Sequence, residues 1–163
     1  MNPDQKKENE SLSKDQIVIF NLHNELFGLN ITRVNEISEL LPMNHVPKAP
    51  GFIKGVINYH GRIVAIHDIA SFFELSTEID ENLARIIILV PGEYHIAFLV
   101  HGVKEIVFVP ETIEEFNPME GEDFKNIYIE KVVCIGESPV NIIDSEKLLA
   151  DLEDYFKEVN IEH

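Results

Sequence analysis

Short runs in which apolar and polar residues alternate dominate the chain. Alternation with a period of two, in runs rich in β-branched residues, is typical of β-strands with one buried face. Residues that favour turns separate these runs, and one of them, Asn24, suits a positive φ in a two-residue hairpin. The pattern predicts strands at residues 16–22, 25–29, 34–41, 55–58, 62–67, 84–90, 94–100, 103–109, 127–135 and 139–143.

Helical periodicity is weaker and is confined to a few segments. Each of the segments 68–75 and 144–156 begins with a residue that can cap a helix. The cap is Asp68 in the first segment and Asp144 or Ser145 in the second. A short helical turn is also expected at 31–36. The second segment repeats apolar residues at the spacing of one helix face, namely Leu148, Leu149, Leu152 and Phe156. The prediction is a mainly β fold with short helices and a C-terminal helix.

Two blocks of sequence recur in the same order. "FGLNITRVNEI" at 27–37 resembles "IAFLVHGVKEI" at 96–106, and "IVAIHDIASFF" at 63–73 resembles "PVNIIDSEKLL" at 139–149. Self-similarity in a mostly β chain indicates two related β-subdomains, each ending in a strand, an aspartate cap and a helix. Closing each sheet into a barrel would remove its exposed edges. Chance similarity between β-rich segments is the alternative.

Length and composition set the class of protein. The 163 residues suffice for one or two small domains, and 45% hydrophobic with 26% charged residues is ordinary for a globular protein. No apolar run approaches the eighteen or so residues of a membrane span. Residues 1–15 lack the apolar core of a signal peptide and indicate a disordered tail, and 157–163 a C-terminal tail. A single cysteine excludes an intrachain disulfide, so we expect a cytoplasmic protein.

Acidic residues exceed basic ones, 29 to 13, for a net charge of −16. Binding to nucleic acid or to an anionic lipid surface requires lysines and arginines that neutralise phosphates, so neither partner is expected. Much of the excess lies in residues 110–125 and 137–163. Two interpretations stay open: a solvated acidic surface, or steering toward a basic patch on a partner.

The histidines are the first candidates for chemistry. A catalytic zinc ion needs three converging ligands, commonly including a helical pair. Here His60 and His67 lie across a predicted turn, while His67 and Asp68 are adjacent and a continuing strand points them to opposite faces. No metal site or other cofactor is predicted. The seven histidines are His23, His45, His60, His67, His95, His101 and His163.

Covalent catalysis has no better support. Cys134 lies in the apolar run "KVVCIG", which predicts an inert core thiol. The serines lack a nucleophile elbow of the G-x-S-x-G type. No glycine-rich loop opens a helix as a phosphate cradle would. The sequence predicts a binding protein that is not an enzyme.

Four segments taken in order resemble the CheW-like family, over residues from about 16 to 150. They are "VIFNLHNELFGLNITRVNEI", "HVPKAPGFIKGVINYHGRIVAIHDIASFF", "ARIIILVPGEYHIAFLVHGVKEI" and "PVNIIDSEKLL". The most diagnostic features are V-x-E-I at 34–37, "VPKAPGFIKGVIN" at 46–58, Gly61, Asp68 and "GVKEI" at 102–106.

This resemblance implies both a fold and a function. The fold is a single domain at 16–156, made of two five-stranded SH3-like β-barrel subdomains with intertwined boundaries around a shared core. The implied function is that of a non-enzymatic chemotaxis adaptor in the cytoplasm, at membrane receptor arrays. Its implied partners are the cytoplasmic tips of chemoreceptors and the CheW-like regulatory domain of the histidine kinase CheA.

The resemblance also implies a partner-binding surface with apolar anchors for a receptor helix and polar groups that set its register. For the apolar members on the two similar motifs, core packing is the alternative interpretation. The implied residues are Val34, Glu36, Ile37, Ile57, Asn58, His60 and Arg62, with Val103 and Ile106 as candidates in the second half.

The departures from the family concentrate in "GVINYHGRIVAIHDIA" at 55–70, where the usual pattern is "GVINLRG-x-IVPVIDLR". His60 replaces a turn arginine, and it offers a smaller, pH-dependent charge in place of a permanent forked one. Arg62 is a neighbouring candidate for that cation. The change leaves two alternatives open: a diverged scaffold for pilus motility or developmental signalling, and a metal-binding or small-molecule enzyme that uses His60, His67 and His101.

Overall fold

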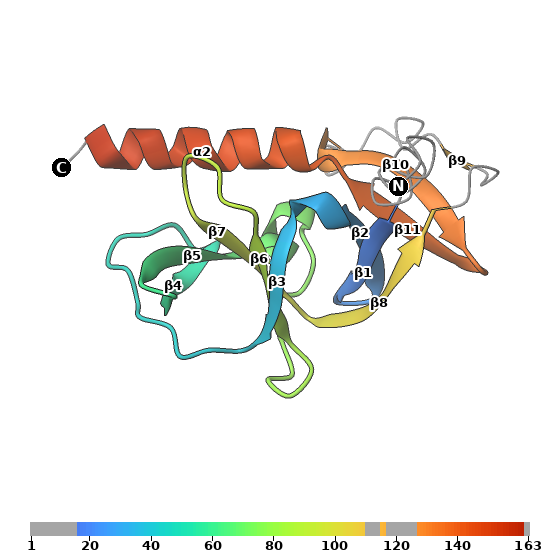
Figure 1. Cartoon of the computed structure of the whole chain (residues 1–163), viewed down its shortest axis with the longest axis horizontal. Coiled ribbons are helices and arrows are strands. Elements are labelled where there is room, and N and C mark those ends of the chain that lie inside the picture. Colours follow the sequence, from blue (N-terminus) through green and yellow to red (C-terminus); the bar gives the residue numbers. More distant parts are fainter. Residues whose placement is uncertain (1–15, 110–114, 117–126, 162–163) are drawn as a thin grey trace, which may run out of the picture.

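The computed structural model describes residues 16–109, 115–116 and 127–161, which form two β-sheets and three helical segments (Figure 1). The predicted tail at 1–15 and most of the acidic segment at 110–125 lie outside the described residues. The strands are β1 (Gln16–Leu22), β2 (Glu25–Asn30), β3 (Val34–Glu39), β4 (Ile53–Tyr59), β5 (Arg62–Asp68), β6 (Arg85–Leu89), β7 (Ile96–Val100), β8 (Gly102–Phe108), β9 (Glu115–Phe116), β10 (Ile129–Ile135) and β11 (Ser138–Ile143). The helical segments are η1 (Ile31–Arg33), η2 (Ile69–Phe73) and α2 (Ser145–Ile161).

The two sheets repeat one strand arrangement. One has the order β8-β1-β2-β11-β10-β9, and the other has the order β3-β6-β7-β5-β4. In each, a central hairpin (β1–β2 or β6–β7) has an antiparallel edge strand on one side and a parallel neighbour on the other. The internal repeat and the two five-stranded SH3-like units are confirmed, with β9 as a two-residue addition to the first sheet.

In each repeat, the strand that follows the central hairpin pairs with the hairpin of the other sheet. Strand β3 follows β1 and β2 in the chain but pairs with β6, while β8 follows β6 and β7 but pairs with β1. The two units therefore exchange their edge strands. Along the chain, the second sheet is one continuous stretch from β3 to β7, while the first sheet combines β1 and β2 with β8 to β11.

The repeated V-x-E-I motif marks a β-bulge in each exchanged strand. In β3 the pairing register shifts between Val34 and Glu36, so Asn35 has no cross-strand partner there. In β8 the register shifts in the same way around Lys104. A bulge bends an edge strand and increases its twist, which helps it to close the sheet. The sequence similarity thus reflects a shared structural device at both edges.

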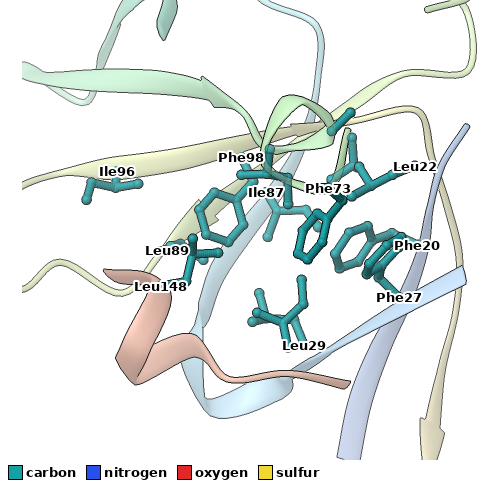
Figure 2. Close-up of a cluster of buried hydrophobic side chains, with 14 of the residues drawn as sticks. Phe20, Leu22, Phe27, Leu29, Phe73, Ile87, Leu89, Ile96, Phe98 and Leu148 are labelled. Atoms are coloured by element: carbon teal, nitrogen blue, oxygen red, sulfur yellow. The ribbon is translucent and has the colours of Figure 1, made fainter. Parts of the chain in front are cut away.

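The shared core lies between the two sheets and under the first turns of α2. Figure 2 shows side chains from β1, β2, β6, β7, η2 and α2 that meet in one cluster. The ring centroids of Phe27 and Phe73 lie 4.8 Å apart, which joins the first sheet to η2. Each sheet also encloses a smaller apolar cluster of its own. Burial of these apolar side chains drives the docking of the two units.

Helix α2 connects the two sheets. It follows β11 of the first sheet, where the Asp144 carboxylate accepts a hydrogen bond from the Lys147 N–H at 3.1 Å. Further along, the rings of Tyr155 and Phe156 reach the second sheet, and Phe156 lies 5.5 Å from the His67 ring. The helix runs to Ile161 and so extends beyond the predicted helix at 144–156, into the segment predicted as a C-terminal tail.

Three local predictions need correction. The helix expected at 68–75 is a five-residue 3₁₀ segment, because Glu74 adopts a left-handed conformation (φ 55°) and ends it. In the β1–β2 turn the positive φ falls on His23 instead of Asn24, and the His23 N–H donates to His101 Nδ1 at 2.9 Å. Cys134 is partly exposed, because strand alternation buries its neighbour Val133.

Candidate partner-binding surface

The β4–β5 hairpin ends in a rigid two-residue turn. Tyr59 and Arg62 are paired across the hairpin, so His60 and Gly61 form the loop. Their φ angles are 51° and 80°, which is the geometry of a type I′ turn and matches the right-handed twist of the strands. The Asn58 side-chain oxygen accepts a hydrogen bond from the Gly61 N–H at 3.0 Å. The tip is therefore held by the backbone and by Asn58 together.

The residues implied as partner contacts differ in exposure along this hairpin. Asn58, His60 and Arg62 are exposed. Ile57 is only 2% exposed and packs inside the second sheet with Val64. Its assignment to a contact surface is therefore not supported: it holds the hairpin in place from the interior.

On β3, the apolar and the charged residues of the V-x-E-I motif differ in their burial. Glu36 is exposed, while Val34 and Ile37 are half-buried against the shared core. Strand β3 ends the second sheet, so one side of its backbone has no strand partner among the described residues. Core packing therefore accounts for Val34 and Ile37. The partner contact stays a prediction, for which Glu36 and the open strand edge are available.

On β8, the same motif offers more apolar surface. Val103 packs against the shared core, but the side chain of Ile106 is 51% exposed. Phe108, two residues further along and on the same face by strand alternation, is 52% exposed. Sequence reasoning missed Phe108, although the alternation through "EIVF" places it level with Ile106. Exposed apolar pairs on an edge strand are suited to a protein contact.

The structure brings the hairpin tip and β3 together. The bulged residue Asn35 lines the same depression of about 250 Å³ as Tyr59, His60 and Arg62. Strand β8 does not contribute to it, since β8 belongs to the other sheet (Figure 1). The residues implied as a partner surface therefore form two areas, one at the tip of the second sheet and one along β8.

His67 and Asp68 are interior groups. The His67 side chain is fully buried, its Nδ1 lies 3.2 Å from the Ala65 carbonyl oxygen, and its ring stacks on Phe52 with centroids 5.9 Å apart. Burial lowers the pKa of His67 to about 4, so the imidazole is neutral at physiological pH. An imidazole held this way serves packing.

Asp68 acts as the cap of η2. Its carboxylate accepts a hydrogen bond from the Ala70 N–H at 3.2 Å and lies 3.6 Å from Lys54 Nζ, which is an ion pair but too long for a hydrogen bond. Burial raises the pKa of Asp68, against the opposing pull of the Lys54 ammonium. The equivalent Asp144 caps α2, as the internal repeat predicts.

His101 is separate from the hairpin tip. Its Nδ1 accepts the His23 N–H, so that nitrogen carries no proton, and burial lowers the pKa of His101 against the opposing effect of Asp68. His60, at the exposed tip, does not join His67 and His101. Among the described residues, no three histidine, cysteine or acidic side chains gather as a metal ion would require.

No helix in the described part of the chain is long and apolar enough to cross a membrane.

The elements that carry the candidate surface are strands and tight turns on two rigid barrels. Such an arrangement presents side chains to a partner without the entropic cost of ordering a loop.

Comparison with known proteins agrees with this architecture. The family model for the CheW-like domain matches residues 16–153. The chemotaxis protein CheW of Klebsiella aerogenes is 31% identical over 141 residues, which cover 85% of this chain and 83% of that protein. The chemotaxis protein CheW of Treponema pallidum is 26% identical over 142 residues, covering 85% and 84%.

A solved structure gives the same result at the level of the fold. The scaffolding protein TtCheW from Thermoanaerobacter tengcongensis superposes with a TM-score of 0.70 at 27% identity, over 80% of this chain and 84% of that one. The family model, at residues 16–153, spans both sheets and the first part of α2. The chain therefore belongs to the CheW-like family of chemotaxis scaffold proteins, which are non-catalytic adaptors.

Proposed function

We propose that this chain is a cytoplasmic adaptor that couples the tips of chemoreceptors to the histidine kinase CheA at membrane receptor arrays. Its partners are the receptor tip itself and the CheW-like regulatory domain of the kinase. The observation that carries the proposal is the family match over residues 16–153, with relatives named as chemotaxis proteins.

The exposed side chains give this proposal a physical basis. Ile106 and Phe108 offer apolar area on β8, and Glu36 and Arg62 offer charge at the second sheet. Interfaces of this kind gain most of their affinity from a few apolar anchors, while the surrounding charges select the partner and its register. Two separate areas suit an adaptor that contacts two proteins.

The direct test is calorimetric titration of the chain with the CheA regulatory domain and, separately, with a receptor-tip fragment. We expect binding in the micromolar range that is typical of transient signalling contacts. No binding to either fragment at high micromolar concentration would contradict the proposal.

A matched pair of variants tests the surface. Ile106→Asp places a charge at an apolar anchor and should weaken binding of one partner about tenfold or more. Ile127→Asp is the control, because Ile127 is exposed to a similar extent, 45% against 51%, and lies outside the proposed areas. Equal affinities for the two variants would remove Ile106 from the contact.

One observation favours a second candidate, a scaffold for another pathway such as pilus motility or development. His60 stands at the tip of a hairpin where the family usually carries arginine, and its side chain is exposed. Under the chemotaxis proposal, His60→Arg should maintain or strengthen receptor binding. Under the second candidate, the same substitution leaves receptor binding undetectable.

A further inference from the structure

The depression at the hairpin tip joins three elements that are distant in sequence. The bulge of β3, the β4–β5 turn and the β6–β7 turn all line it. Its floor is apolar, formed by Val64, Ile88 and Ile96, each of which is at most 3% exposed. A depression of about 250 Å³ with a buried floor has room for one side chain.

The wall of this depression carries one permanent cation, Arg62, and two imidazoles. Arg62 and His60 come from the hairpin, and His95 comes from the β6–β7 turn. No acidic side chain lines it. Within the described residues, none of these three side chains makes an ion pair.

A second depression provides the contrast. It holds about 290 Å³ on the other side of the β6–β7 turn, and its cation is already neutralised. Arg33 lies 2.9 Å from the Glu146 carboxylate there, and Glu153 also lines the wall. That depression therefore has no charge to offer to an anion. The tip depression does have a charge to offer to an anion.

We propose that the tip depression binds the carboxylate of a glutamate side chain on a protein partner, with Arg62 and His95 as its principal charged contacts. The apolar floor accommodates the methylene groups, and the cationic wall pairs with the carboxylate. This inference rests on the proposed adaptor function, and it identifies the partner chemistry of the hairpin tip.

His95 is the new specificity residue in this assignment. Its backbone carbonyl accepts a hydrogen bond from the Ala65 N–H at 3.1 Å, which fixes the β6–β7 turn beside β5. Its side chain thereby shares a depression with residues more than thirty positions earlier in the chain. The turn arginine is replaced by His60, which reduces the positive charge at the hairpin tip. Arg62 and His95 together supply that charge instead.

Butyrate and butyramide test the chemistry of the site directly, since they reproduce the side chains of glutamate and glutamine together with the Cα carbon. Each is titrated into the isotopically labelled full chain, and the amide and imidazole signals of residues 60–62 and 95 are followed by NMR. We expect butyrate to shift these signals with a dissociation constant on the order of 10 mM, and butyramide to shift them much less. Equal effects of the two compounds, or no shift at these residues, would overturn the proposal.

Variants then assign the charge. Arg62→Gln and His95→Gln should each weaken butyrate binding by about threefold or more, as expected for loss of a partly exposed charge pair. Lys147→Gln is the matched control, because Lys147 is exposed on α2 outside the depression. Equal weakening in all three variants would show a general charge effect and would overturn the site.

Titrations with the two protein fragments separate this proposal from the proposed function. The same variants are titrated with whichever of the two fragments, receptor tip or CheA regulatory domain, binds the native chain. A threefold loss for Arg62→Gln and His95→Gln supports the glutamate contact. Unchanged fragment affinity overturns it while leaving the adaptor function intact. Failure of both fragments to bind the native chain counts against the adaptor function and against a protein glutamate as the occupant, and butyrate binding would then identify a free-acid site.

Discussion

The fully buried imidazole of His67 illustrates how one residue sets a condition for folding. Its ring lies between Phe52 and Phe156, at 5.9 and 5.5 Å, where the second sheet meets α2. The family usually has an apolar residue at this position, and the neutral imidazole takes that role here. Protonating it would place a charge among aromatic rings, which explains why burial lowers the pKa of His67 to about 4.

Stability should therefore fall in mild acid. Between pH 6.5 and 4 the unfolded chain binds a proton at His67 that the folded chain does not, so the free energy of unfolding decreases as pH falls through this range. From pH 6.5 to 5 this amounts to about 2 kcal/mol. The measurement is urea unfolding at pH 7, 6 and 5, in the native chain and in His67→Leu.

His67→Leu should lose most of this dependence. His101 has a lowered pKa and contributes in the same direction, whereas the raised pKa of Asp68 acts in the opposite direction, so the difference between the two proteins isolates His67. If the pH dependence is the same in both proteins, His67 does not titrate as described.

The cap residue Asp68 allows a second prediction at this scale. Asp68→Ala removes the acceptor of the Ala70 N–H and leaves Lys54 without its ion pair, which should cost about 2 kcal/mol of the free energy of unfolding. Asp68→Asn keeps an acceptor and removes a buried charge, so its cost should be less than half as large. Chemical denaturation of both variants checks this, and an asparagine variant as unstable as the alanine variant would contradict it.

Individual strands could be predicted because their apolar residues alternate locally. The exchange of β3 and β8 between the sheets could not, since pairing is decided by contacts distant in sequence. The extension of α2 to Ile161 was missed, although Val159 continues the apolar spacing three residues after Phe156. The shortness of η2 was missed because it depends on the left-handed conformation of a single residue, Glu74.

In the candidate site, too, only locally determined features could be predicted. The turn at Gly61 and the exposure of His60 follow from local turn chemistry. Strand alternation could have placed Ile57 inside, because its neighbour Asn58 is outside. His95 could not be found this way: it reaches the hairpin tip only because β7 pairs in parallel with β5.

At the scale of elements, α2 depends on aromatic contacts with the second sheet. The ring of Phe156 stacks on Tyr94 with centroids 5.1 Å apart and meets His67 edge-on. Phe156→Ala should lower the free energy of unfolding by about 2 kcal/mol, less than for a fully buried phenylalanine because Phe156 is half-buried. Amide exchange in the last turns of the helix should also accelerate.

Asp154→Ala is the control for this helix, because Asp154 is exposed two residues earlier. It should leave both stability and exchange nearly unchanged. If Phe156→Ala and Asp154→Ala behave alike in urea unfolding and in hydrogen exchange, the second sheet does not anchor α2.

At the scale of the molecule, two similar barrels expose different chemistry. The first sheet offers apolar area at Ile106 and Phe108, and the second offers Arg62 and His60 at a rigid tip. Because the shared core locks the barrels together, the two areas keep a fixed relation to each other. A protein with two distinct areas on one rigid body is suited to hold two partners at once.

This division predicts a specific result for Phe108. Phe108→Asp should weaken the same partner as Ile106→Asp, by a similar factor of about ten, while the affinity for the other partner is unchanged. Calorimetry with the receptor-tip and kinase fragments checks the assignment. Equal losses with both partners, or no loss, would contradict two separate areas.

The measurement that tests the adaptor role most directly is co-sedimentation of CheA with receptor-containing membranes, with and without this chain. The account predicts that CheA enters the pellet in amounts that rise with the added chain, and that Ile106→Asp abolishes the increase while Ile127→Asp does not. CheA that stays in the supernatant at every concentration of the chain, or that pellets equally in its absence, would contradict the account.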